Sequence, residues 1–292
     1  MIVVVAAIFA ISSASQKKTT NGPTNKLSKI PVSQIPLTKI ERQPVSADRI
    51  FLVSDIHGRF DSFKKALSAV KFDKSDQLFV LGDTIDRGPD GFHALLYLTQ
   101  TLPAEGYHVT VLTGDHEEMW LQIAGKGDTD TARLSALTET VDSYKGNVPN
   151  GWSASYNEWL QLTASERTFL LKEFADGFDQ PHALIVNADG KWLSLSHTAN
   201  FAKPLSEQTV DDLSWNNQHM RNAPVTYRQS VADTLHVPVS DTQVFIGHIS
   251  NVLFGQQPNF IDLDDTPVFV SLKEFVATPV KIYELNDGKF YQ

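Results

Sequence analysis

The 292-residue sequence contains no cysteine. This absence excludes a disulfide framework, a thiolate nucleophile and any cysteine-ligated metal, so a metal site must use nitrogen and oxygen ligands. Basic residues are also few, since 25 lysines and arginines face 34 aspartates and glutamates, which gives a formal net charge of −9. A general nucleic-acid-binding protein needs a basic face, and we therefore expect no nucleic acid partner.

Long apolar runs are lacking except at the N-terminus, where residues 2–11 are almost unbroken and small residues follow at 12–15. Ten residues are too few to span a bilayer but match the apolar region of a signal peptide, although no lysine or arginine precedes them. We interpret residues 1–15 as a signal peptide or a short anchor. This predicts a protein exported to the periplasm or another extracytoplasmic space, or anchored by its N-terminus, with a cytoplasmic location as the alternative.

Residues 16–47 are polar and contain four prolines, which is typical of a linker. Residues 48–292 are long enough for one large domain, and the 41% of hydrophobic residues in the chain allows a sizeable core. The first part of this domain alternates apolar, strand-like runs with amphipathic segments of helical period, which predicts a sheet covered by helices. The expected strands here are 50–54, 77–81 and 107–112, and the expected helices are 60–71, 89–102 and one from about 116.

The middle of the chain, from about 125 to 176, shows helical patterns without a clear strand, and we interpret it as a helical insertion. After it the strand patterns return, and the turn at 286–288 indicates a β-hairpin. Two sheets that enclose a shared core would account for this order. The expected strands of this second part are 183–187, 192–196, 243–247, 268–272 and 279–285.

Three short polar strings stand out: SDIHG at 54–58, GDTIDRG at 82–88 and GDHE at 114–117. Each follows an apolar, β-like run and therefore lies where a strand would end and a loop begin. Open α/β sheets place their sites at that end of the strands. Because carboxylates and imidazoles are common ligands of hard and borderline divalent metals, the three strings together predict a two-metal centre.

Two isolated histidines extend this set, because each follows a strand-like run, at 192–196 and at 244–247. The complete inventory suits two divalent ions that share one bridging carboxylate. Two such ions about 3.5–4 Å apart can activate a water and clamp both oxygens of an in-line phosphoryl displacement. The candidate ligands in chain order are Asp55, His57, Asp83, Asp115, His197 and His248.

The chain resembles the calcineurin-like metallophosphoesterases and, within them, the PPP-type serine/threonine phosphoprotein phosphatases, bacterial ones included. Their motifs read GDxHG, GDxxDRG and GNHE, followed by two separated histidine motifs. Here the corresponding strings read SDIHG, GDTIDRG, GDHE, SHTAN and IGHIS, in the same order, from about residue 49 to the C-terminus. The resemblance implies a four-layer α/β/β/α sandwich, which here carries the helical insertion, and hydrolysis of phosphomonoesters by a metal-bridging hydroxide.

The resemblance also implies how the two divalent ions would be held, with manganese expected and iron or zinc as alternatives. Asp55 and His57 would hold the first ion, and Asp83 would bridge both ions. The second ion would be held by Asp115, His197 and His248.

The same resemblance assigns roles around the substrate phosphate. His116 would be the general acid that protonates the leaving alkoxide, and Asp86 would orient it. Arg87 would grip the phosphate, because a planar guanidinium suits phosphate oxygens. The family has a second phosphate-binding arginine between the two late histidines, for which Arg221 is the candidate and Arg228 the competitor.

Three positions depart from the family pattern. Ser54 replaces the usual glycine just before a ligand, and Thr198 replaces the small residue that commonly follows the first late histidine. Asp115 stands where the family has asparagine, and it adds a negative charge beside the second ion. This charge should tighten metal binding, and it could make the bridging hydroxide less acidic.

The expected substrate is phosphoserine or phosphothreonine in proteins, since the Asp86-Arg87 pair favours that branch of the family. A dinucleoside polyphosphate hydrolase is the first alternative, although such relatives commonly lack the aspartate of that pair. Small phosphoesters and phosphotyrosine are further alternatives, and a catalytically weak phosphate-binding or protein-binding module is the non-enzymatic one. Membrane contact is expected only through the N-terminal anchor, and the sequence indicates no oligomeric state.

Two further acidic features have an expected structural role. Glu117 is interpreted as a helix-start carboxylate favoured by the helix dipole. The acidic run at 262–265 lacks the glycine and glutamate spacing of a calcium loop and is interpreted as a solvated turn.

Overall fold

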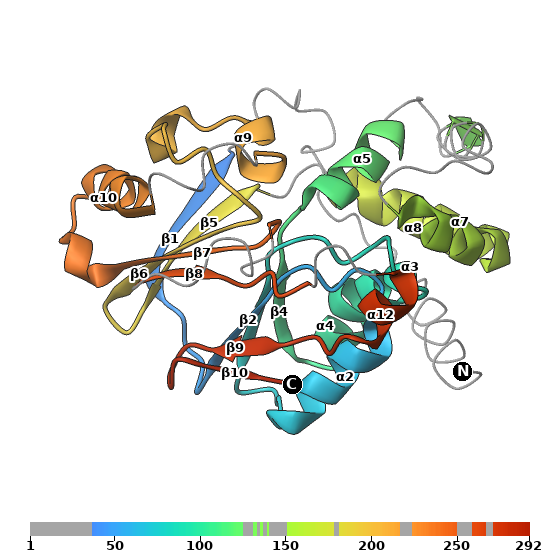
Figure 1. Cartoon of the computed structure of the whole chain (residues 1–292), viewed down its shortest axis with the longest axis horizontal. Helices are drawn as coiled ribbons and strands as arrows, with labels where there is room; N and C mark the ends of the chain where they lie inside the picture. The colour runs from blue at the N-terminus through green and yellow to red at the C-terminus, as the bar shows by residue number, and fades with distance from the viewer. Residues whose placement is uncertain are drawn as a thin grey trace, which may run out of the picture.

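Two five-stranded β-sheets form the centre of the molecule, and helices lie against their outer faces (Figure 1). The chain is seen in a computed structural model that describes residues 37–124, 131, 132, 135, 136, 139, 151–177, 181–216, 224–249, 259–266 and 271–292. The arrangement confirms the predicted α/β architecture of two sheets flanked by helices. It also brings the ends of strands from both sheets to one region, which is where those predicted site residues that the structure describes lie.

The first sheet has the strand order β10-β9-β2-β3-β4, in which β2, β3 and β4 are parallel and β9 and β10 are antiparallel additions. Each of the three parallel strands leads directly into one of the three polar strings. Because parallel strands end at the same edge, the three strings meet there. The bounds are β2 (Ile50–Val53), β3 (Gln77–Val80), β4 (His108–Val111), β9 (Ile282–Glu284) and β10 (Lys289–Tyr291).

Alternating side chains of β2 divide between two hydrophobic clusters. Ile50 and Leu52 pack between the two sheets, whereas Phe51 and Val53 pack against helix α2 (Phe60–Ala69). Successive side chains of a strand point to opposite faces, so a strand that is buried on both faces is apolar throughout. This explains why the strands before the polar strings appear as unbroken apolar runs.

The second sheet has the order β1-β5-β6-β7-β8, in which only β5 and β6 are antiparallel neighbours. One face packs on the first sheet, and the other packs on helix α10 (Pro224–Leu235). Helix α9 (Val210–Ser214) lies above and to the right of α10 in Figure 1. His197 directly follows β6, and His248 lies just beyond β7. The bounds are β1 (Thr38–Pro44), β5 (Ala183–Ala188), β6 (Lys191–Ser196), β7 (Thr242–Ile246) and β8 (Phe260–Asp262).

A third group of helices packs beside the loops that follow the first sheet. Phe92, Trp120 and Trp159 lie together in its core, with ring centroids 5.0–6.0 Å apart. The last two helices of this group belong to the predicted insertion, whose other residues lie largely outside the described ones. Its members are α3 (Gly91–Leu96), α5 (Asp115–Ala124), α7 (Trp152–Gln161) and α8 (Ala164–Gly177). A π-helical turn (Tyr97–Thr101) and the short α4 (Leu102–Ala104) continue α3.

Some sequence-based boundaries need correction. Strand β1 lies within the segment expected to be a linker, and it pairs in parallel with β5, so this part of residues 16–47 belongs to the sheet. The expected strand at 268–272 is wrong at its described end, where Leu272–Ala277 forms helix α12. Ser271 and Glu274 form a capping box there, and this local hydrogen bonding outweighs the apolar, strand-like pattern. The pattern also missed β8, α9 and α10.

The prediction of a signal peptide or short anchor concerns residues 1–15, which lie outside the described ones. Among the helices that the structure describes, none is long and apolar enough to cross a bilayer. Residues 1–15 as a signal peptide or anchor therefore remain a prediction from the sequence.

Candidate metal centre and phosphate site

Six of the predicted site residues lie in loops with a left-handed backbone. Their φ angles are between 45° and 72°, a region that costs an L-residue about 1–2 kcal/mol. Such conformations persist only where the surroundings hold them, and they are frequent at functional sites. The residues are Asp55, His57, Asp83, Asp86, Arg87 and His248.

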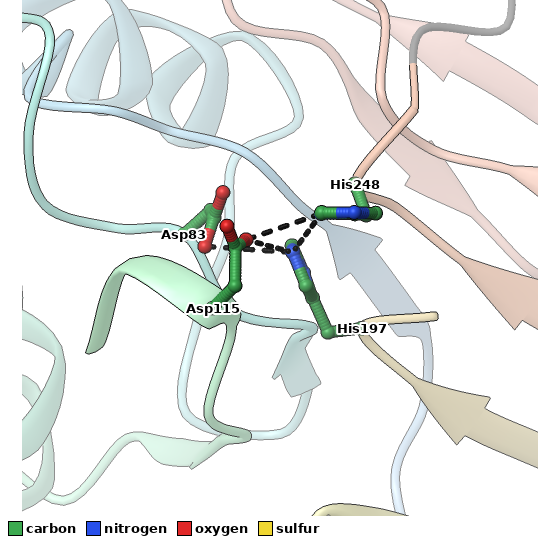
Figure 2. A group of neighbouring side chains, drawn as sticks. All are labelled: Asp83, Asp115, His197 and His248. Carbon is green, nitrogen blue, oxygen red and sulfur yellow. Dashed lines mark hydrogen bonds and ion pairs between the residues drawn. The ribbon is translucent and has the colours of Figure 1, made fainter. Parts of the chain in front are cut away.

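Four side chains from four segments converge in the first ligand group, and Figure 2 shows them pointing toward one another. Asp83, His197 and His248 follow β3, β6 and β7, and Asp115 is the first residue of α5. The Oδ1 atom of Asp115 lies 3.1 Å from Nε2 of His197 and 3.1 Å from Nδ1 of His248, and these two nitrogens are 3.2 Å apart. Two ligands at right angles on a divalent ion, each about 2.1 Å from it, are about 3.0 Å apart. The spacing of the three atoms therefore suits one shared divalent ion.

The carboxylate of Asp83 connects this group with a second one. Its Oδ1 lies 3.4 Å from Nε2 of His197, whereas its Oδ2 lies 3.2 Å from Nε2 of His57. Asp55 completes the second group, because its Oδ1 lies 3.7 Å from the same nitrogen of His57. One carboxylate that presents a different oxygen to each group has the arrangement expected of a bridging ligand.

Hydrogen bonds select the imidazole atoms that face the centre. Nδ1 of His57 lies 2.9 Å from the carbonyl oxygen of Ile85, and Nδ1 of His197 lies 2.8 Å from that of Leu81. A carbonyl only accepts, so Nδ1 carries the proton in both rings, and Nε2 of the neutral ring presents a lone pair to the centre. Nε2 of His57 and Oδ1 of Asp55 are buried without a hydrogen-bond partner. Both observations show that the residues present fit divalent metal ions.

The candidate acid and phosphate-binding groups lie beside the second group. Nδ1 of His116 lies 2.7 Å from Oδ2 of Asp86, and Nε2 of the same ring lies 3.3 Å from a guanidinium nitrogen of Arg87. Burial lowers the pKa of His116, but the carboxylates of Asp83 and Asp86 outweigh it and raise that pKa to about 9. A cationic imidazole and a guanidinium this close to each other favour the binding of an anion beside them.

Two glycines let the loops approach closely. A Cβ atom on Gly114 would overlap the backbone and carboxylate of Asp83, and one on Gly247 would overlap Ser54 and the Asp55 carboxylate. Only a residue without a side chain permits these contacts. The glycines of GDHE and IGHIS are thus required by the packing of the site.

Glu117 has a larger role than a helix-start carboxylate. Its two oxygens accept hydrogen bonds from four backbone N–H groups, at 2.8–3.1 Å, and the side chain is buried. Three of these groups belong to the loop that carries Asp83 and one to Gly114. Burial and the charge of Asp83 raise the pKa of Glu117 to about 7, although the amide hydrogen bonds oppose this shift. Glu117 therefore holds two of the ligand loops together, a role without a signal in the sequence.

The acidic run at 262–265 is not a solvated turn. Asp262 and Asp264 are each 2% exposed. Burial, and for Asp264 the nearby Asp55, raise the pKa of both carboxyls well above the ordinary value. The guanidinium of Arg59 stabilises this end of the site, because it donates to the backbone oxygen of Asp55 at 2.6 Å and lies near the charge of Asp265. The interpretation was wrong because the run begins at the end of the buried strand β8 and its Leu263 packs in the core between the two sheets.

The three departures from the family pattern have distinct surroundings. Ser54 donates to the carbonyl of Leu81, and Thr198 is buried and donates to the carbonyl of Asn216. Burial tends to raise the pKa of Asp115, but hydrogen bonds from His197 and His248 bring it to about 2. Asp115 is thus a carboxylate that directly faces the ligand group.

The second phosphate-binding arginine was expected at Arg221, which lies outside the described residues. Its competitor, Arg228, donates to the carbonyl of Val239 at the turn that precedes β7. His248 lies beyond the opposite end of that strand, so the structure does not bring Arg228 to the site.

The family model of calcineurin-like phosphoesterases matches residues 48–260. The chain belongs to this family. A family member of this kind is a metallophosphoesterase, a hydrolase that uses divalent metal ions, and the donor set described above agrees with that.

Individual relatives show two different activities. The symmetrical bis(5'-nucleosyl)-tetraphosphatase of Serratia proteamaculans is 38% identical over 96 residues, which are 32% of this chain and 32% of that protein. Serine/threonine-protein phosphatase 2 of Escherichia coli is 28% identical over 150 residues, 51% of this chain and 57% of that protein. The matches thus span a third to little more than half of these relatives.

A solved structure shares the fold over most of its length. The protein serine/threonine phosphatase of Saccharomyces cerevisiae aligns with a TM-score of 0.50 at 13% identity, over 87% of this chain and 78% of that one. At this identity the likeness concerns the fold alone.

Replacing Glu117 by glutamine tests its role as the support of the ligand loops. An amide has one acceptor oxygen instead of two and turns an NH2 group toward backbone N–H donors, so the loops should loosen. We expect Mn²⁺ affinity to fall roughly 10- to 100-fold, as for other residues that support metal ligands. Isothermal titration calorimetry of the apoprotein measures this.

The matched control is Glu207→Gln, which removes a charge from an exposed turn. Equal Mn²⁺ affinities for Glu117→Gln and the control would contradict the supporting role.

Proposed function

We propose that this chain hydrolyses phosphomonoesters of serine and threonine in proteins, with two divalent ions held by the two ligand groups. The observation that carries this proposal is the unit of Asp86, His116 and Arg87. Nδ1 of His116 lies 2.7 Å from Asp86 and its Nε2 lies 3.3 Å from Arg87, which supports an acid beside a phosphate-binding group. A phosphomonoester of an alcohol needs both, since it carries two negative charges and has a poor leaving group.

The protein groups divide the work of such a reaction. Arg87 binds the phosphate oxygens and neutralises part of their charge. His116 holds a proton on Nε2 for the departing alkoxide, and Asp86 keeps the ring in the required tautomer and orientation through Nδ1. When bound, divalent metal ions supply Lewis acidity, which stabilises negative charge and lowers the pKa of water.

The proposed first ion has Asp55 and His57 as ligands, and the proposed second has Asp115, His197 and His248, with Asp83 shared. Manganese is the proposed metal, since nitrogen and oxygen donors without cysteine suit it, and iron and zinc are the alternatives.

A dinucleoside polyphosphate hydrolase is the second candidate, and the identity of 38% with the Serratia tetraphosphatase favours it. The two candidates differ in the leaving group. A nucleotide leaves as a phosphate, which hardly needs a proton, whereas serine leaves as an alkoxide. The Asp86–His116 pair is therefore needed more by the first activity.

A comparison of three substrates tests the proposal. With added Mn²⁺ we expect turnover of p-nitrophenyl phosphate and of a phosphoserine peptide, and slower turnover of diadenosine tetraphosphate, measured by phosphate release and chromatography. Faster hydrolysis of the dinucleotide than of the peptide would establish the second candidate instead. No turnover of any substrate by protein with bound Mn²⁺ would leave a binding module.

The acid role of His116 makes a separate prediction. His116→Asn should lower kcat on an alkyl phosphate by roughly 10²- to 10⁴-fold and much less on p-nitrophenyl phosphate, whose leaving group barely needs a proton. Steady-state kinetics on both esters measure this difference. Equal losses on the two substrates would count against proton donation.

The carboxylate at position 115 should strengthen metal binding. Asp115→Asn removes one negative charge but keeps an oxygen, so Mn²⁺ affinity should fall roughly tenfold, because ligand charge tunes the affinity of oxygen sites. Titration calorimetry measures this, with Asp211→Asn on the exposed side of α9 as the control. An affinity that stays at the wild-type value would show that the extra charge has no effect on the metal.

A further inference from the structure

The first residues of helix α7 contact the backbone of the candidate phosphate-binding turn. The N–H group of Asp86 donates to the hydroxyl oxygen of Ser155 at 3.1 Å, and the N–H group of Arg87 donates to the carbonyl oxygen of Gly151 at 3.0 Å. Ser155 has no exposed surface. Two consecutive amides of the turn thus depend on acceptors from the helical insertion, more than sixty residues away in the chain.

This turn needs such support because its backbone is strained. Asp86 and Arg87 have φ angles of 66° and 63°, and neither is a glycine. Two successive left-handed residues are strained, so other contacts must select this conformation. The following amide, that of Gly88, donates to the carbonyl oxygen of His57 at 3.0 Å. Helix α7 and Gly151, the residue just before it, supply the acceptors for the two strained residues themselves.

Helix α7 is itself fixed to the protein beside the turn. The carboxylate of Glu158 accepts hydrogen bonds from the N–H groups of Phe92 and His93, both at 3.0 Å, at the start of α3. Nδ1 of His93 lies 2.7 Å from the same carboxylate. The ring of Trp159 is buried, with its centroid 5.8 Å from that of Phe92. The helix therefore contacts both the Arg87 turn and the start of α3, which follows it in the chain.

We propose that helix α7 sets the conformation of the Asp86–Arg87 turn for phosphate binding, with Ser155 as the positioning residue. Its hydroxyl oxygen accepts a hydrogen bond from the Asp86 backbone and so fixes that backbone. The positions of the Asp86 carboxylate, which contacts His116, and of the Arg87 guanidinium depend on it. The insertion thereby controls phosphate affinity. This inference rests on the proposed function, because it assigns the turn to the substrate phosphate.

Ser155→Ala removes the acceptor without adding bulk, and it leaves the buried N–H group of Asp86 without that partner. We expect faster hydrogen exchange at the Asp86 and Arg87 amides by NMR. The affinity of the Mn²⁺-loaded protein for inorganic phosphate should fall roughly three- to tenfold, as one lost hydrogen bond implies. Mn²⁺ affinity should not change, and KM for p-nitrophenyl phosphate should rise more than kcat falls. A general loss of folded structure would lower Mn²⁺ affinity and kcat as well as phosphate affinity.

The matched control is Ser153→Ala, an exposed serine on the same helix, which should leave all these quantities unchanged. Gly151→Ala perturbs the same contact independently, because its Cβ atom would lie 2.7 Å from Cγ and 3.0 Å from Cα of Arg87. It should also weaken phosphate binding, and it provides the measurement if Ser155→Ala does not fold.

Wild-type amide exchange and phosphate affinity in both variants would overturn the inference. Those results in a protein that hydrolyses phosphoesters would leave the proposed function intact. Conversely, weaker phosphate binding by Ser155→Ala, in a protein that hydrolyses none of the three substrates, would support the inference and contradict the proposed function.

Discussion

The carboxylate of Asp83 lies between two imidazoles that come from different sheets, His57 from the first and His197 from the second. Much of the structure follows from this position. The two sheets must end at the same point, and their shared apolar core determines how closely they approach. The loops must also bend sharply enough to direct their side chains inward, which is why Asp83 and its neighbours adopt left-handed backbone conformations.

Concentrating these groups has an electrostatic cost and a conformational cost. Buried carboxylates repel one another, and burial disfavours their charged forms, as the raised pKa values of Asp262 and Asp264 show. Divalent cations would offset this repulsion, and the guanidinium of Arg59 offsets it near Asp55. The conformational cost is offset by hydrogen bonds that the backbone N–H groups of these loops donate to acceptors elsewhere in the chain. Glu117 holds the loop of Asp83, and the acceptors of helix α7 hold the turn of Arg87.

The site therefore consists of candidate ligand residues and of residues that support their loops. The sequence pattern identifies the first kind much better than the second. The candidate ligand residues carry distinctive chemistry and follow apolar strand patterns, so their types and positions could be read directly. The supporting residues are a glutamate, a serine and a glycine, which are common everywhere and whose function depends on what lies opposite them. A polar run such as 262–265 is ambiguous for the same reason, since its exposure depends on how the two sheets pack around it.

The sequence by itself determined the three parallel strands, the polar strings at their ends and the identity of the candidate ligands. These features depend on alternating burial and on side-chain chemistry, both of which are local. Only the tertiary structure decided which oxygen of Asp83 faces each ligand group, that β1 joins the second sheet at its edge and that helix α7 contacts the Arg87 turn. These contacts join residues far apart in the chain, and their hydrogen bonds have no periodicity that would reveal them. The position of each partner is set by the packing of the two sheets, which exists only in the folded protein.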